Sequence, residues 1–213
     1  MHRVRTSNQG FTLLEIVIVV AIIGFMTALA VPKFLAYQQR QDARTMVRRV
    51  SSVISNARSE AIRRGNNQFV LLDFPANGLI RVVDDANNDW AVSVGETTRD
   101  ISLTSGLSAE ISRWSVVPSP PAASAVPEDG VVMPAGGTSF PIDAASTSPG
   151  VGFTPRGFPV SLPTVIGGSA GPLGSGAGSY YVTDNDTLVY AATLLPLGGT
   201  RVRGYRAVTD DWF

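Results

Sequence analysis

An uninterrupted apolar segment near the N-terminus, from Phe11 to Val31, constrains this fold more than any other feature. The segment holds about 21 residues, enough for one helical crossing of a bilayer at roughly 1.5 Å per residue. Its one ionisable side chain is that of Glu15. A carboxylate inside a membrane costs free energy, and such residues are usually functional. The segment therefore predicts a single membrane-spanning helix over 11–31 with a functional carboxylate near its start.

The residues before this helix indicate its orientation. They carry Arg3 and Arg5 and no acidic residue, and positively charged flanks stay on the cytoplasmic side of a membrane. We therefore expect a single-pass membrane protein whose N-terminus is cytoplasmic and whose remainder lies on the other side of the membrane. A secretory signal peptide would be cleaved after its apolar run, behind small residues. Here Gly10 precedes the run, so cleavage after it would leave the helix attached.

The sequence Gly10-Phe-Thr-Leu-Leu-Glu15 and the apolar helix that follows it resemble the leader and N-terminal helix of type IV prepilins and type II secretion pseudopilins. The resemblance implies that prepilin peptidase removes residues 1–10 as a leader, cutting after Gly10, and methylates the new terminal amine of Phe11. It also implies that Glu15 pairs with the terminal amine of a neighbouring subunit in a filament. Such a pair attracts strongly at low dielectric and relieves the burial of both charges. An ordinary signal anchor with a chance glutamate is the alternative.

The helix is expected to continue past the membrane, over 32–64. Gly24 and Pro32 stand at the places usual for the resembling family and are the expected kinks, since proline removes a backbone hydrogen bond. After Pro32, apolar residues recur at steps of three and four and form one face of an amphipathic helix. These residues are Met46, Val47, Val50, Val53, Ile54, Ala57 and Ala61. Gly65 is the expected end of the helix.

Beyond Gly65 the sequence pattern changes to that of a β-rich domain, 65–213. Alternating or β-branched runs separated by turn residues predict antiparallel strands. The expected strands are Gln68–Phe74 and Leu79–Val83, which form a hairpin, then Trp90–Val94, Thr98–Leu103, Arg113–Val117, Gly150–Phe153, Phe158–Leu162, Tyr180–Thr183, Thr187–Ala192 and Arg201–Ala207. Segments 118–149 and 167–179 are rich in Pro, Gly, Ala and Ser and are expected to be irregular loops. The fold class is α+β: a long N-terminal helix with an antiparallel sheet packed on its second half.

Two further stretches, Asn56–Gly65 and Gly152-Phe-Thr-Pro-Arg-Gly157, resemble H-type minor pseudopilins and FimT/FimU-type minor pilins. The resemblance implies a minor structural subunit of a type IV pilus or of a type II secretion pseudopilus. Its expected partners are other pilin or pseudopilin subunits, prepilin peptidase and the inner membrane. The sequence does not separate the two filament types.

The composition restricts catalysis. The chain has no cysteine, one histidine, His2, and one lysine, Lys33. The domain after Gly65 therefore lacks the usual nucleophile–base pairs, histidine metal ligands and Schiff-base lysines. We expect a non-catalytic protein, with an anchored enzyme that uses carboxylates alone as the alternative. Formal charge is zero over the whole chain, which argues against general coating of nucleic acid.

An acidic stretch is the candidate cation site. Asp85, Asn87, Asp89 and Glu96 stand at the first, third, fifth and twelfth places of a calcium loop. Trp90 occupies the place where that motif needs glycine. An Asx-rich turn between strands is the preferred interpretation. Ca²⁺ is the one cofactor that the sequence suggests.

Three arginines near the C-terminus are the candidate DNA contacts. Alternation along a strand puts Arg201 and Arg203 on one face with Tyr205, and Arg206 on the other. Basic side chains beside an aromatic ring can hold phosphates and stack a base. A membrane-anchored DNA receptor for DNA uptake is therefore the alternative function, and a solvated strand face is the preferred interpretation.

Overall fold

The computed structural model describes residues 11–73, 79–103, 137–140, 149–163, 168–183, 188–206, 209 and 211–213. The chain divides into two compact units between Gln38 and Gln39. Helix α1 (Leu13–Arg64) contributes its first half to one unit and its second half to the other.

The first unit is an apolar helix whose side chains are exposed. Its most apolar stretch has a mean hydropathy of 2.7 and no buried residue, so by length and composition it could cross a membrane. Thr12 begins the helix, because its Oγ1 accepts the backbone N–H of Glu15 at 3.2 Å. The helix runs through Gly24 and Pro32 without interruption. The break expected at Pro32 is therefore not observed, and kinking in a filament stays a prediction.

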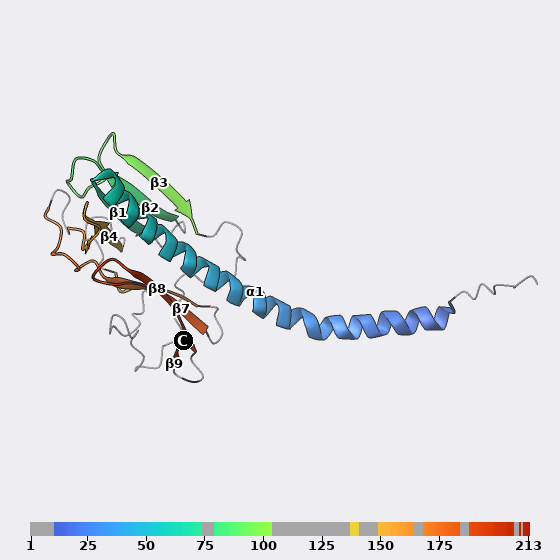
Figure 1. The fold of residues 1–213 in the computed structure, drawn as a ribbon. Coiled ribbons are helices and arrows are strands. Elements are labelled where there is room, and N and C mark those ends of the chain that lie inside the picture. The colour runs from blue at the N-terminus through green and yellow to red at the C-terminus, as the bar shows by residue number, and fades with distance from the viewer. Residues whose placement is uncertain are drawn as a thin grey trace, which may run out of the picture. The chain divides into compact units, whose positions relative to one another are not determined.

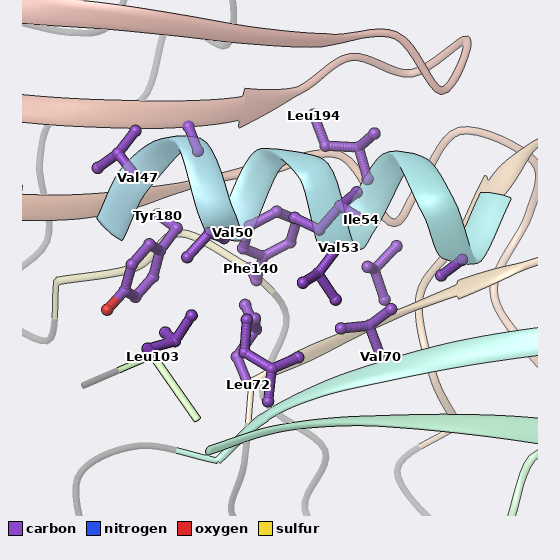
Figure 2. Packing of buried hydrophobic residues seen from close by; sticks show 14 of the residues in the cluster. Val47, Val50, Val53, Ile54, Val70, Leu72, Leu103, Phe140, Tyr180 and Leu194 are labelled. Atoms are coloured by element: carbon purple, nitrogen blue, oxygen red, sulfur yellow. The ribbon is translucent and has the colours of Figure 1, made fainter. Parts of the chain in front are cut away.

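The second unit is built on the other half of α1. All seven residues of the predicted apolar face are buried, and Ala43 joins them. Both sheets lie against this part of the helix (Figure 1). Figure 2 shows Val50 and Ile54 of α1 in one cluster with Leu72 and Leu194 from the two sheets. The helix ends as predicted at Gly65, which has a φ of 72° and donates its N–H to Ala61 O at 3.0 Å.

Within the described residues, nine strands form two antiparallel sheets. The first sheet has the order β3-β2-β1-β4-β5, and the second has the order β6-β7-β8-β9. The strands of the first sheet are β1 (Asn67–Asp73), β2 (Leu79–Asp85), β3 (Thr97–Ser102), β4 (Gly150–Phe153) and β5 (Pro159–Val160). Those of the second are β6 (Gly178–Thr183), β7 (Leu188–Leu194), β8 (Thr200–Arg206) and β9 (Asp211–Trp212). The α+β class and the antiparallel sheets are confirmed, but there are two sheets where one was expected.

Several predicted elements need correction. Trp90–Val94 is not a strand but part of a loop between β2 and β3. The strand expected over Phe158–Leu162 is reduced to β5. In segment 167–179, turns within 172–177 are closed by hydrogen bonds from Ser175 N–H to Pro172 O at 3.0 Å and from Ala177 N–H to Gly174 O at 3.3 Å, and Gly178 and Ser179 belong to β6. The strand predicted over Arg113–Val117, and most of the loop 118–149, lie outside the described residues.

Candidate functional site

The start of α1 brings the predicted processing and assembly residues together. Gly10 lies outside the described residues, while Phe11 is exposed and directly precedes the capping residue Thr12. Glu15 is three residues after the cap, the position at which a glutamate completes a capping box. No described residue forms an ion pair with Glu15. The arrangement leaves the Glu15 carboxylate exposed beside the backbone that precedes the helix.

The acidic stretch after β2 closes into a tight loop around a buried carboxylate. Asp85 is fully buried. Its Oδ1 accepts the N–H of Asp89 at 3.0 Å and its Oδ2 accepts the N–H of Trp90 at 3.1 Å. Asn88 and Trp90 have φ values of 60° and 57°, in the left-handed region that glycine usually supplies. Trp90 thus takes the backbone conformation of the motif's missing glycine.

Packing explains how a tryptophan is tolerated there. The Trp90 ring lies over Gly152 of β4, where an added β-carbon would collide with it. The ring packs with the buried cluster of Phe69, Val83 and Leu162. This burial and the hydrogen bond from Trp90 N–H to Asp85 offset the strain of a positive φ, which is on the order of 1–3 kcal/mol.

Three of the four predicted calcium ligands meet in this loop. Carboxylate oxygens of Asp85, Asp89 and Glu96 lie within 4.8 Å of one another. Asn87 braces the loop: its Oδ1 accepts the N–H of Asp89 at 3.1 Å, and its Nδ2 donates to Asp89 Oδ2 at 2.9 Å.

The charge state of this loop favours a cation. The Ala91 N–H bonded to Asp89 lowers the pKa of that carboxyl, and bonds from Ser93 and Asn87 add to the effect. Glu96 Oε2 accepts the N–H of Ser93 at 2.9 Å. Glu96 Oε1 is buried and has no hydrogen-bond partner among the described residues.

The C-terminal arginines have no exposed Tyr205 ring beside them. Arg201 is exposed and Arg203 half-buried on one face of β8, and both have interactions within the chain. Tyr205, expected beside them as a stacking ring, is only 1% exposed and packs on Trp212 with ring centroids 5.1 Å apart. Arg206 instead lies over the Phe213 ring, 5.1 Å from its centroid. The expectation of an accessible aromatic among these arginines was wrong, because β9 covers Tyr205.

A small hollow between α1, β1, β2 and β3 holds two further carboxylates, which share one arginine. It is lined in part by Glu60, Arg64 and Asp84. Arg64 donates to Glu60 at 2.9 Å and to Asp84 at 2.6 Å. The bonded Arg63 and Arg64 guanidinium groups lower the pKa of Glu60. Glu60 is therefore held ionised as an ion-pair partner and is not poised as a general acid.

Comparisons with known proteins match the N-terminal region and part of the domain. Residues 5–31 match the family model of the prokaryotic N-terminal methylation motif. A fimbrial protein of Pseudomonas aeruginosa is 44% identical over 107 residues, which cover 43% of this chain and 68% of that protein. The type IV major pilin protein PilA of Myxococcus xanthus (strain DK1622) is 50% identical over 40 residues, 19% of this chain and 18% of PilA. No solved structure matches.

These findings agree with the geometry of α1. The methylation motif contains Gly10, Phe11 and Glu15 and ends where the apolar segment ends, at Val31. The fimbrial relative is matched over two thirds of its own length, beyond what an apolar helix alone would give. The chain belongs to the type IV pilin family.

Proposed function

We propose that this chain is a non-catalytic minor pilin or pseudopilin, a structural subunit of a type IV pilus or a type II secretion pseudopilus. The observation that carries the proposal is the coincidence of the methylation motif, residues 5–31, with an exposed apolar helix that begins beside Phe11. Prepilin peptidase would cut after Gly10 and methylate Phe11. Before assembly the subunit would lie in the inner membrane with its second unit in the periplasm.

In this proposal Glu15 pairs with the terminal amine of a neighbouring subunit. Its exposed carboxylate and the lack of an ion-pair partner among the described residues support this role. Away from water, an unpaired carboxylate is costly, and a neighbour's amine offsets part of that cost. The pair would also fix the axial position of one helix against the next.

The minor role is supported by the size of the second unit. The fimbrial relative aligns with only 43% of this chain. The second unit of this chain has two sheets with long connections, which suits a filament end or a rare position better than a closely packed shaft. This choice between a minor and a major subunit is tested by counting copies per filament.

The proposal is tested by N-terminal sequencing, intact mass and incorporation into sheared filaments. We expect a chain that starts at N-methyl-Phe11. Glu15→Ala and Glu15→Gln should both be lost from filaments, because neither keeps the charge. Glu15→Gln keeps a hydrogen-bonding side chain for the capping box, so its normal incorporation would assign Glu15 to capping. An uncleaved chain that starts at Met1 would contradict the whole proposal.

We also propose that the loop of Asp85, Asp89 and Glu96 binds Ca²⁺. The convergence of three carboxylates and the buried, unpartnered Glu96 Oε1 favour this second role. Ca²⁺ binds six to eight oxygens at about 2.3–2.6 Å, so water or backbone carbonyls would complete the shell. Filling such a site would hold the loop between β2 and β3 in one conformation.

Terbium is the sharpest probe of this site, because Trp90 lies within the loop and can sensitise its luminescence. We expect sensitised emission from the full chain that Ca²⁺ displaces and that Glu96→Gln abolishes. Asp100→Asn is the matched control, since Asp100 pairs with Arg81 on the surface, 2.8 Å away. Ca²⁺ at about 100 times its Kd should add about 2.7 kcal/mol to the stability. If millimolar Ca²⁺ neither displaces sensitised terbium emission nor raises the stability, the loop is an Asx-rich turn that binds no Ca²⁺.

A further inference from the structure

Three tight turns meet the last turn of α1 on one surface of the second unit. The turns are 154–158 between β4 and β5, 172–177 before β6, and 195–199 between β7 and β8. We call the surface formed by their exposed side chains and Ile62 the turn platform. Its members are Ile62, Pro155, Arg156, Leu173, Pro196 and Leu197.

Close contacts at three glycines show that the platform is continuous. A β-carbon added at Gly157 would lie 2.6 Å from Ile62 Cδ1, so the isoleucine covers this turn. One added at Gly198 would lie 2.7 Å from Gly157 O, and one at Gly174 would lie 3.3 Å from Pro196 Cβ. Each turn therefore touches the next, from the helix end to the loop before β6.

The backbone of the platform is fixed by internal hydrogen bonds. Gly157, Gly174 and Gly198 have φ values of 78°, 85° and 83°, which side chains larger than hydrogen disfavour. Gly157 donates to Thr154 O at 2.7 Å, and Gly198 donates to Leu195 O at 2.8 Å. Arg58 of α1 donates from Nε to Gly157 O at 2.9 Å. A surface with so fixed a backbone loses little conformational entropy when a partner binds.

Three aliphatic side chains of the platform are exposed to solvent. Ile62, Leu173 and Leu197 are 51%, 61% and 73% exposed. A continuous apolar patch on a folded domain usually marks an interaction surface. The fixed contour of the turns favours a partner of complementary shape, a protein, over a fluid lipid surface.

The charges around the platform define the partner further. Arg156 is exposed, and no ion pair joins it to a described residue. Arg63 and Arg64 at the helix end are balanced by the carboxylates of Glu60 and Asp84, so Arg156 supplies the positive charge for a partner. Arginine is enriched among the residues that contribute most to binding at interfaces. A complementary surface would carry aliphatic side chains and a carboxylate that meets Arg156.

We propose that the turn platform is the docking surface for a second pilin-like subunit, which contributes an aliphatic patch and a carboxylate. This inference rests on the proposed function, because it takes the chain to be a filament subunit. Among the platform residues, Leu197 would be buried by the partner and Arg156 would form the charge pair.

The test uses the full chain in its native host with a photo-crosslinking residue, p-benzoylphenylalanine, in place of Leu197. The same residue in place of the exposed Thr98 on β3 is the control. We expect illumination of sheared filaments to give an adduct between position 197 and a pilin-like subunit, at a peptide with aliphatic and acidic residues. Arg156→Glu should lower the adduct yield at least tenfold without changing the melting temperature of the chain.

The outcomes separate this inference from the proposed function. If the chain is processed and enters filaments, but position 197 gives no subunit adduct, the platform is not a docking surface. An adduct that Arg156→Glu leaves unchanged refutes the charge pair, and adducts with lipid alone assign the platform to a membrane. If the wild-type chain never enters filaments, the proposed function is refuted, and this inference is refuted with it.

Discussion

Two isoleucines on the same helix allow one substitution to be tested in two environments. Ile54 is 1% exposed and belongs to the core between the two sheets, whereas Ile62 lies half-exposed on the turn platform. Replacement by alanine removes the same carbon atoms from each. At about 0.8 kcal/mol per buried methylene, the transfer loss at Ile54 is about 2.4 kcal/mol. The remaining cavity raises the expected loss of stability to about 3–4 kcal/mol, within the range for such truncations.

At Ile62 the same truncation should cost about 1 kcal/mol or less, since half of the side chain is already in water and alanine favours the helix. For a domain of about 150–250 residues, each kcal/mol moves Tm by about 2–4 °C. We therefore expect Ile54→Ala to lower Tm by about 6–16 °C and Ile62→Ala by about 4 °C or less. Thermal unfolding of the full chain in detergent, followed by near-UV circular dichroism, measures both. Equal shifts for the two variants would refute the buried position of Ile54.

Two further outcomes are expected. The Ala91 N–H lowers the pKa of Asp89, and the Arg81 guanidinium lowers the pKa of Asp100. The two ionised carboxylates therefore stabilise the fold above about pH 4, and this stabilisation is lost as the pH falls through their lowered pKa values. A Tm series from pH 7 to pH 2 should therefore fall at its acid end, and a flat series would contradict this origin of stability. Because Tyr205 is buried, DNA binding measured by fluorescence anisotropy at 50 and 200 mM salt should not distinguish the wild type from Arg201→Ala/Arg203→Ala; salt-sensitive binding lost only in the variant would support the DNA-receptor alternative.

Elements whose conformation is decided by residues close by in the sequence were predictable from the sequence. The apolar face of α1 follows the helical repeat, and every residue predicted on it is buried. The helix ends at Gly65, where glycine takes a positive φ at no steric cost. The first hairpin forms with Phe69 opposite Val83, which keeps both side chains on one face.

The errors arose where distant groups decide the local conformation. Residues 90–94 alternate like a strand, but two of the N–H groups that a strand would pair are bonded to acidic side chains: Trp90 N–H donates to Asp85 and Ala91 N–H donates to Asp89. The Trp90 ring packs over Gly152, which is distant in the sequence, so the residues around Trp90 do not predict this contact. The convergence of Asp85, Asp89 and Glu96 was predictable because their spacing carries the signal. Burial of Tyr205 was missed because the strand that covers it, β9, has only two residues and no periodic pattern.

The position of β1 at the centre of its sheet has a consequence for the order of folding. One neighbour, β2, follows after a short connection, whereas the other, β4, begins at Gly150. A hairpin closes in about 1–10 μs, but pairing across so long a stretch of chain is much slower. The β1–β4 pairing cannot form until the second half of the chain has been synthesised. Until then β1 presents a free hydrogen-bonding edge, so the new chain passes through a period in which strand pairing between molecules competes with completion of its own sheet.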